Sequence, residues 1–171
     1  EVKVPTQPRT TYSASVVGGG VSVNSIPADV WLEVDMRSED KTELAKIDAK
    51  FLAILQEAAE HENAARSTRL GKITVEPKLI GERPTGHTSA DALIVATTAA
   101  AARAAGYTPE LGASSTDSNI PISLGIPAVT IGSGGTGGRA HSLDEWIDVA
   151  KPESLRGMTV GLAAVLAMAG V

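Results

Sequence analysis

Residues 30–37 read VWLEVDMR, and this stretch decides how the first half of the chain folds. Val30, Leu32, Val34 and Met36 alternate with Trp31, Glu33, Asp35 and Arg37. A period of two is typical of a strand with one buried face. Residues 10–17 form a second strand-like run, and the glycines at 18–20 follow it as a turn or bulge. Because only a short connection joins the two runs, we expect them to pair antiparallel.

A helix and a further strand follow this hairpin. Across residues 38–66, apolar side chains recur at intervals of three and four, which gives a helix one apolar face. These side chains are Leu44, Ile47, Phe51, Leu55 and Ala58. Asp40 and Glu43 resemble a capping pair at the start of this helix. Residues 71–80 are predicted as another strand, so the first half is a small β-β-α-β sheet that carries one helix.

The composition changes at residues 82–86, where Pro84 and Gly86 indicate a domain boundary. The pattern beyond it predicts a helix over 89–105 capped by Ser89, a brief helix ending at Gly125, a buried strand over 126–131, a glycine-rich loop over 132–138 and a closing helix over 152–169. This alternation favours a parallel or mixed sheet with helices on its faces. The predicted fold class is therefore α/β, with an α+β first half.

The composition excludes several classes of function. The chain has 171 residues and a formal net charge of −5, which gives it no electrostatic footprint for nucleic acid or an anionic membrane. It has no Cys, so disulfides, thiolate metal sites and Cys nucleophiles are excluded. The apolar run at 157–171 is shorter than the about 20 residues needed to span a bilayer. Nothing points to a membrane, and the cytoplasm is the expected compartment.

The glycine-rich loop is the first candidate for chemistry. Residues 132–137 match G-x-G-x-x-G after a predicted strand, but a dinucleotide fingerprint needs a helix directly after it and an acidic residue about 20 positions on. The residues Ala-His-Ser follow at 140–142 instead. We therefore expect a flexible loop at a strand end, which is also where α/β proteins place their sites.

His141 lies just beyond this loop and has two functional interpretations besides a solvated one. Its neutral ring can bind a metal ion. Alternatively, it can act as the base of a Ser-His-Asp arrangement with Ser114 or Ser115 and Asp117. The sequence has no G-x-S-x-G elbow to support that second arrangement. Asp117 can equally be a helix cap.

The remaining candidates are individually weak. His61 lies on the polar side of the long helix, and His87 lies in the boundary segment, where exposure is the default. Arg37 can simply pair with Asp35 or Glu39. In the same way, Asn24 can make a turn and Arg83 can be an ordinary charge at the boundary.

Four ordered motifs nevertheless carry a resemblance, and it extends from about Thr11 to the C-terminus. They are Asn-Ser-Ile-Pro at 24–27 followed by Asp-Met-Arg at 35–37, Glu-Arg-Pro-Thr-Gly at 82–86, Ser-Thr-Asp-Ser-Asn at 115–119 with Leu-Gly-Ile-Pro at 124–127, and Ala-His-Ser-Leu-Asp-Glu-Trp at 140–146. This set resembles the dinuclear-zinc carboxypeptidase and deacylase family. That family includes glutamate carboxypeptidase, acetylornithine deacetylase, succinyl-diaminopimelate desuccinylase, aminoacylase and peptidase T.

The resemblance implies a domain organisation. In this family an α/β catalytic domain carries an inserted lid domain, which often forms a homodimer. Residues 1–82 would be the lid, or dimerisation domain, without its first strand and helix, and residues 83–171 would be the C-terminal part of the catalytic domain. The chain starts at Glu1 in an extended run with prolines, which we interpret as the middle of a longer polypeptide.

The resemblance also implies chemistry: two zinc ions, with cobalt or manganese as alternatives, and a general-base Glu cleave an amide bond next to a free carboxylate. His141 would be a metal ligand, and Glu145 would orient its segment. Asn24, Arg37 and Arg83 would bind the substrate, a small peptide or N-acyl amino acid, because an arginine fork suits a carboxylate and an amide can donate to an oxyanion. Asp117, Gly134 and Gly135 would line the site.

One departure is large. The family's other ligands come from an H-x-D motif, an Asp and a Glu-Glu pair that lie upstream, and this chain has neither H-x-D nor Glu-Glu. A zinc site needs about four ligands, and this chain offers one candidate. We therefore expect that the 171 residues contain neither a complete metal centre nor the general base, and that they are inactive alone. Two alternatives stay open: a non-catalytic dimerisation and carboxylate-binding module, and a metal-independent Ser/His/Asp hydrolase.

Overall fold

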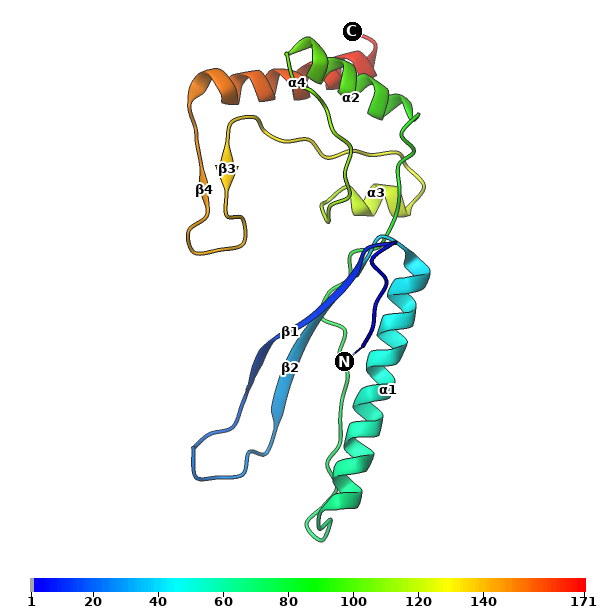
Figure 1. Ribbon diagram of the computed structural model, residues 1–171, viewed down its shortest axis with the longest axis vertical. Coiled ribbons are helices and arrows are strands. Elements are labelled where there is room, and N and C mark those ends of the chain that lie inside the picture. Colours follow the sequence, from blue (N-terminus) through cyan, green and yellow to red (C-terminus); the bar gives the residue numbers. More distant parts are fainter. Residues whose placement is uncertain (1) are drawn as a thin grey trace. The chain divides into compact units, whose positions relative to one another are not determined.

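The computed structural model describes residues 2–171 and divides into two compact units, one up to Thr85 and one from Gly86 (Figure 1). The first unit contains strands β1 (Thr10–Gly19) and β2 (Val30–Ser38) and helix α1 (Lys41–Ala65). The second contains helices α2 (Leu93–Ala104), α3 (Asn119–Ser123) and α4 (Lys151–Ala169) and the two-residue strands β3 (Gly137–Gly138) and β4 (Trp146–Ile147). The expected mixture of a small antiparallel sheet with one helix, followed by a region of helices and short strands, is confirmed.

The β1–β2 hairpin has the antiparallel pairing that the alternation in residues 30–37 predicts. Thr11 lies opposite Arg37 and Gly19 opposite Val30, with one irregularity between Ala14 and Val16. Gly18 lies beside the Trp31 indole, and a Cβ at Gly18 would come 2.5 Å from its Cζ2 atom. The missing side chain therefore lets the indole lie across the neighbouring strand.

Helix α1 begins where the capping pair predicts. The Asp40 carboxylate accepts the backbone N–H of Glu43 at 2.9 Å, which satisfies one of the unpaired donors at the helix start. The helix packs against β2, and Ile47 and Ala59 are its buried residues. The predicted apolar face is thus correct at Ile47, but it is wrong at Ala58, which is exposed, because the face rotates onto Ala59 at that point.

The strand predicted over residues 71–80 is wrong in this chain. The segment is extended, but it makes no backbone ladder with any described residue. A side chain holds it instead: the Asn63 amide donates from Nδ2 to the Ile73 carbonyl and accepts the Ile73 N–H at Oδ1, both at 2.8 Å. One amide at the end of α1 therefore supplies both bonds that a neighbouring strand would supply.

Helices α2 and α4 pack together in the second unit, where Val95, Val160 and Ala164 are buried. Gly157 of α4 lies directly against the backbone of Gly134, and a Cβ at Gly157 would come 2.5 Å from the Ser133 carbonyl oxygen. Gly134 has φ of 82°, a conformation that favours glycine. The glycine-rich loop therefore packs backbone to backbone on α4.

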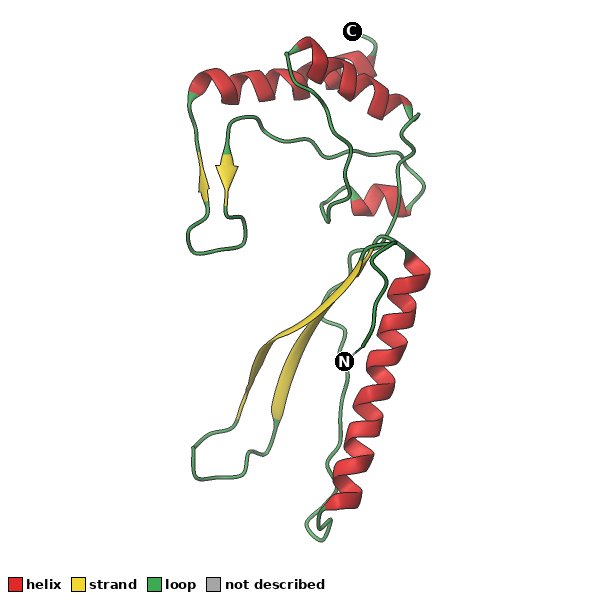
Figure 2. Ribbon diagram, in the orientation of Figure 1, coloured by secondary structure: helices red, strands yellow, loops and turns green. Residues whose placement is uncertain are grey.

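The parallel or mixed sheet expected in the second half is absent from the described chain. Residues 126–131 are extended, but side chains rather than a ladder hold them: Thr88 Oγ1 donates to the Ala128 carbonyl at 2.7 Å and accepts the Ala128 N–H at 3.2 Å. The strands that form, β3 and β4, are a short antiparallel pair (Figure 2). A segment becomes a strand only when another segment pairs with it, and no described residue does so here.

The helices lie inside the predicted ranges, except that α4 begins at Lys151 rather than at 152. Helix α2 starts at Leu93 after Ala92, so Ser89 does not cap it; its carbonyl accepts the Ala92 N–H at 3.0 Å in the preceding turn. Helix α2 ends at Ala104, and Gly106, with φ of 81°, allows the Tyr107 N–H to bond back to the Ala102 carbonyl at 2.9 Å. This turn fixes where Tyr107 leaves the helix.

Candidate functional site

The structure separates two of the substrate-binding candidates of the first unit. Asn24 is exposed in the turn that joins β1 to β2, and its Oδ1 accepts the Ser22 hydroxyl at 2.5 Å. Arg37 lies near the other end of β2, seven residues beyond Val30. At about 3.3 Å per strand residue, that end lies roughly 20 Å from the turn. One hairpin therefore does not bring Asn24 and Arg37 to the same ligand.

Arg37 is held by its neighbour Asp35 on the same face of β2. The Arg37 Nε donates to Asp35 Oδ1 at 2.6 Å, and Nη2 donates to Oδ2 at 3.2 Å. The hydrogen bond from Arg37 lowers the pKa of Asp35, and the same bond raises the pKa of Arg37. Both groups therefore stay charged at neutral pH, although their side chains are 62% and 52% exposed for Arg37 and Asp35.

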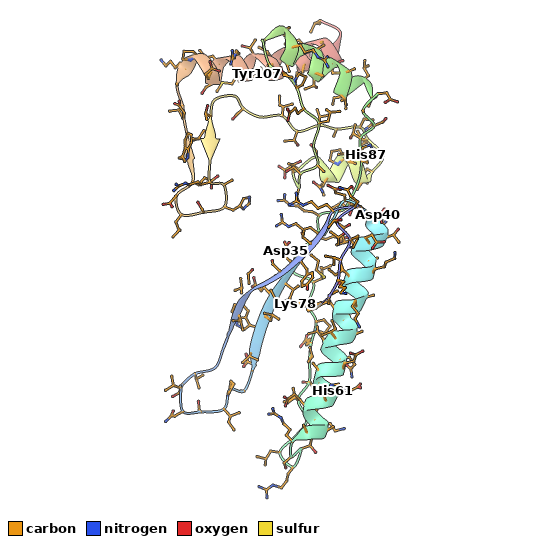
Figure 3. All side chains as sticks on the ribbon, in the orientation of Figure 1. Asp35, Asp40, His61, Lys78, His87 and Tyr107 are labelled. Carbon is orange, nitrogen blue, oxygen red and sulfur yellow. The ribbon has the colours of Figure 1, made fainter. Side chains whose placement is uncertain are left out.

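Three other charged or titratable candidates lie on the surface. Arg83 is exposed in the extended segment that ends the first unit. His61 is exposed on α1, and His87 is exposed at the start of the second unit (Figure 3). These positions agree with a solvated role for both histidines.

His141 lies in the loop between β3 and β4 with a left-handed backbone, φ of 64°. The loop is closed by the Ser142 N–H, which donates to the Arg139 carbonyl at 3.2 Å, and by an Arg139–Asp144 ion pair of 3.1 Å. The His141 side chain is exposed, as is Glu145 four residues on, and no hydrogen bond joins these two side chains in the described chain. The loop thus presents the imidazole outward.

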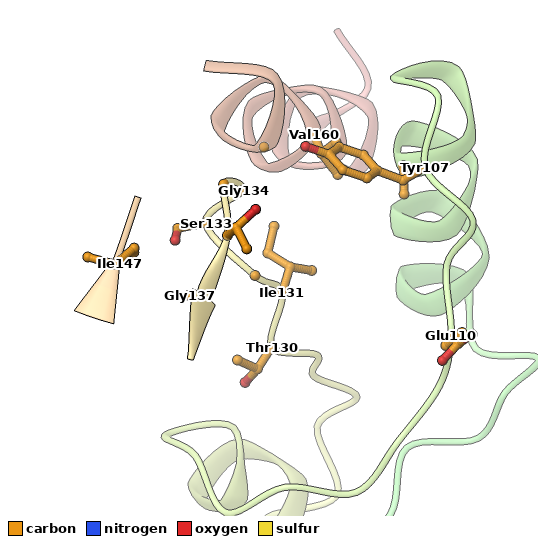
Figure 4. Close-up of a pocket in the computed structure, with 14 residues that line it drawn as sticks. Tyr107, Glu110, Thr130, Ile131, Ser133, Gly134, Gly137, Ile147 and Val160 are labelled. Atoms are coloured by element: carbon orange, nitrogen blue, oxygen red, sulfur yellow. The ribbon is translucent and has the colours of Figure 1, made fainter. Parts of the chain in front are cut away.

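The glycine-rich loop lines an open cavity of about 500 Å³ within the second unit (Figure 4). Gly134 and Gly135 both have positive φ and lie on its wall. A Cβ at Gly135 would come 2.8 Å from the Asp148 carbonyl oxygen, so a larger residue would push the loop away from the backbone at Asp148. Asp117 is not part of the wall.

Two residues of this wall were missed by the sequence reasoning. Tyr107 and Glu110 follow α2 and face the glycine-rich loop across the cavity. The Tyr107 hydroxyl is buried without a hydrogen-bond partner in the described chain, and the Arg156 guanidinium lies 4.5 Å from the ring centroid. The turn at Gly106 was the one signal for Tyr107; nothing in the sequence marked Glu110.

A hydroxyl network fixes the segment around Asp117. The Thr130 hydroxyl lies 2.7 Å from the hydroxyls of both Thr116 and Ser118, and the Asp117 carbonyl accepts the Ile120 N–H at 3.3 Å. The Asp117 side chain is exposed. Two small polar residues on either side of Asp117 therefore tie the start of α3 to the extended segment at 126–131.

The alternative Ser/His/Asp arrangement finds no contacts that support it. Ser114 and Ser115 are exposed, and neither is hydrogen-bonded to His141 in the part of the chain that the structure describes. The same holds for His141 and Asp117. The dinucleotide interpretation also lacks its context, because residues 132–137 lead into β3 rather than into a helix.

The donor set of this chain does not fit a zinc centre by itself. Within residues 2–171, no three His, Asp or Glu side chains lie close enough together to hold one ion. A structural or catalytic zinc ion takes three or four protein ligands, and His141 is a single exposed donor. We therefore derive no catalytic step through a metal from these residues.

Comparison with known families gives one match. Residues 3–63 match the family model of the peptidase dimerisation domain, M20_dimer, which covers the β1–β2 hairpin and most of α1. This match supports the M20 peptidase family and points to a chain that forms homodimers. No curated protein matches the chain.

Among residues 2–171, no helix is long and apolar enough to cross a bilayer.

Proposed function

We propose that this chain is the lid and the C-terminal catalytic portion of a zinc-dependent metallopeptidase or amidohydrolase. Its substrate class is a small peptide or N-acyl amino acid, cleaved at the amide bond next to a free carboxylate. The observation that carries the proposal is the dimerisation-domain match over residues 3–63, in which the hairpin and α1 form the lid. Residues 1–82 are the lid in this proposal, and residues 83–171 belong to the catalytic domain.

The proposed roles follow the chemistry of the side chains. Arg37 and Arg83 bind the substrate carboxylate, because a guanidinium offers paired donors to two oxygens. The Asn24 amide donates to substrate oxygen. Because Asn24 and Arg37 lie far apart along one hairpin, the two side chains of the same chain would contact different substrate molecules.

The second unit supplies the proposed metal side of the site. His141 is a zinc ligand, with Glu145 orienting its loop. Gly134 and Gly135 line the pocket, in which the loop backbone approaches the substrate closely. Asp117 lies outside the wall of this cavity and would line another part of the site. The outward position of the His141 imidazole is compatible with a metal ion whose other ligands, and whose general base, come from outside these residues.

Two features of the second unit support completion by the N-terminal part of the catalytic domain. Residues 126–131 are extended without a ladder partner in the described chain. Helix α4 also carries a second apolar stripe on the face opposite its buried residues: Leu155, Met158, Leu162 and Val165, between 57% and 65% exposed. Sheet strands that pair with 126–131 would cover an apolar helix face of this kind.

The test is hydrolysis by the complete polypeptide that contains this chain, with N-acetyl amino acids and dipeptides as substrates. The proposal expects hydrolysis that a chelator removes and zinc restores. His141→Ala should lower kcat by about 100-fold or more, because loss of a metal ligand removes the metal from the site. The matched control His61→Ala, on the exposed side of α1, should retain wild-type rates.

Two results would contradict the proposal. Hydrolysis that survives chelation and loss of His141 would favour the Ser/His/Asp mechanism. A complete polypeptide that forms dimers and binds N-acyl amino acids without cleaving them would instead identify a non-catalytic module.

A further inference from the structure

One face of β2 carries a row of charged side chains. Glu33, Asp35 and Arg37 are two residues apart and therefore project from the same face. Thr11 and Ser13 of β1 lie opposite Arg37 and Asp35, so the neighbouring strand places only small polar side chains beside this pair, and Val16 lies opposite Glu33. Asp35 is the ion-pair partner of Arg37, and Glu33 forms no ion pair in the described chain.

The geometry of the pair leaves one edge of the guanidinium unused. Asp35 takes the side edge of Arg37, through Nε at 2.6 Å and Nη2 at 3.2 Å. A guanidinium has five N–H donors in a fixed plane, so both Nη1 donors and the second Nη2 donor stay available. One Nη1 donor and the second Nη2 donor form the end edge, which matches a second carboxylate in the same two-point manner.

We propose that Asp35 is a positioning residue that holds the Arg37 guanidinium by its side edge and thereby presents its end edge to the substrate carboxylate. This inference rests on the proposed function, because it assigns Arg37 a carboxylate ligand. Arginine has large rotamer freedom, and a ligand that meets an already oriented guanidinium orders less of the side chain on binding.

Charge repulsion opposes the positioning effect of Asp35. Asp35 is itself negative and repels a ligand carboxylate, as does Glu33. At an exposed site this repulsion is weak and screened by salt, whereas the loss of orientation acts on the hydrogen-bonding group itself. Positioning therefore outweighs repulsion for Asp35, while Glu33, which does not contact Arg37, contributes repulsion alone.

The experiment measures the binding of N-acetylglycine to the complete polypeptide by calorimetry, with single substitutions. Asp35→Ala should raise Kd by about 1.5- to 2-fold because the guanidinium loses its anchor, and an exposed ion pair limits the effect to that size. Asp35→Asn should give a smaller increase, since the amide oxygen still accepts the Nε–H. The matched control Glu33→Gln removes one negative charge from the same face and should leave Kd unchanged or lower it slightly.

A second measurement separates positioning from misfolding. The Arg37 Nε–H signal in a nitrogen-15 NMR spectrum reports the Asp35 bond directly, and it should shift in both Asp35 variants while the backbone amide signals of β1 and β2 stay in place. Glu33→Gln should leave the Nε–H signal unchanged.

The outcomes distinguish the inference from the proposed function. Arg37→Met must weaken N-acetylglycine binding; if it does not, or if the wild type binds no N-acetylglycine, the carboxylate role of Arg37 is wrong and the inference falls with it. If Arg37→Met weakens binding but Asp35→Ala tightens it to the same extent as Glu33→Gln, Asp35 is only a repelling charge. The positioning role is then wrong, and the proposed function stands.

Discussion

The long helices of the two units meet different kinds of partner. Helix α1 packs against β2, a strand of nine residues in a regular ladder, and it buries the side chains of Ile47 and Ala59. Helix α4 packs against α2 and against the bare backbone of Gly134, and two of its three buried residues are Gly157 and Ala164. The contact of α1 with the hairpin is made by side chains, whereas the contact of α4 with the glycine-rich loop depends on the absence of a side chain at Gly157.

The two contacts therefore make the two units sensitive to opposite kinds of substitution. The first unit depends on apolar volume between the helix and the hairpin, so it is weakened by removing atoms. The second depends on close backbone approach at the glycine-rich loop, so it is weakened by adding atoms. Substitutions that add or remove atoms at these two contacts should therefore have the largest effects, and substitutions of single polar side chains should have smaller ones.

The largest effect is expected from Gly157→Val. Its Cβ would overlap the Gly134 backbone, which is not the end of a flexible side chain, so either α4 or the loop must move. We expect a loss of about 3 kcal/mol, at the upper end for overpacking. The measurement is denaturant unfolding followed by tryptophan fluorescence in a Trp31→Phe background, so that the signal comes from Trp146 of the second unit.

Gly161→Ala is the matched control on the same helix. A Cβ there meets only the flexible end of Ile131 at 3.3 Å, and alanine is better than glycine in a helix by about 1 kcal/mol. This variant should be neutral or stabilising. Equal losses at Gly157 and Gly161 would mean that α4, rather than its contact with the loop, is sensitive.

Ile47→Ala tests the contact of the first unit and should cost about 2 kcal/mol, because Ile47 is only 6% exposed and its truncation leaves a cavity. The value lies at the low end for such a change because no large side chain of the described residues is completely buried, so neighbours can collapse into the space. Denaturant unfolding followed by the fluorescence of Trp31 in a Trp146→Phe background measures the loss in the first unit.

Leu52→Ala, on the exposed side of α1, is the control for Ile47. It should cost less than about 0.5 kcal/mol, as surface changes do. A loss as large as that of Ile47 would show that another surface covers Leu52 in solution.

Asn63→Ala should cost about 1 kcal/mol, because it removes both hydrogen bonds that hold Ile73. Amide hydrogen exchange at Ile73 should become faster in this variant while exchange in the middle of α1 stays the same. Asn63→Asp keeps the acceptor for the Ile73 N–H and loses the donor, so an intermediate result is expected. Unchanged exchange at Ile73 in Asn63→Ala would contradict the anchoring role.

The smallest effect is the pH dependence of the Asp35–Arg37 pair. The hydrogen bond from Arg37 lowers the pKa of Asp35 in the folded chain, so its contribution is complete above the ordinary Asp pKa. That contribution is lost as the pH falls through the lowered value. Because both side chains are more than half exposed, it amounts to about a few tenths of a kcal/mol.

The check on this pair compares the wild type with Asp35→Asn in unfolding experiments at neutral pH and at successively lower pH, down through the lowered pKa of Asp35. The stability difference should be present at neutral pH and vanish at low pH. A difference that grows at low pH would contradict the assigned direction.

The sequence predicted the parts of the fold whose partners are close by in the chain. The alternation at 30–37 and the run at 10–17 pair with one another, and the spacing around Ile47 marked the helix face that packs on them. The sequence also left open whether Arg37 pairs with Asp35 or Glu39, and the structure selects Asp35 at 2.6 Å.

The sequence failed where a segment depends on a distant partner. Residues 71–80 and 126–131 have strand-like composition, but composition does not reveal that Asn63 and Thr88 take the place of strand neighbours. Strands β3 and β4 have two residues each, too few for a period to be recognised. Tyr107 and Glu110 reach the cavity through the turn after α2, a geometry that no local motif encodes.

In the proposed enzyme, His141 supplies one ligand to a metal centre whose other ligands lie outside these residues. Elemental analysis of zinc in purified protein tests it most directly, with residues 1–171 and the complete polypeptide measured side by side. We expect about two zinc ions per complete polypeptide, fewer in the His141→Ala variant, and none bound stably by residues 1–171. Two stably bound zinc ions on residues 1–171 alone, or none on the complete polypeptide, would contradict it.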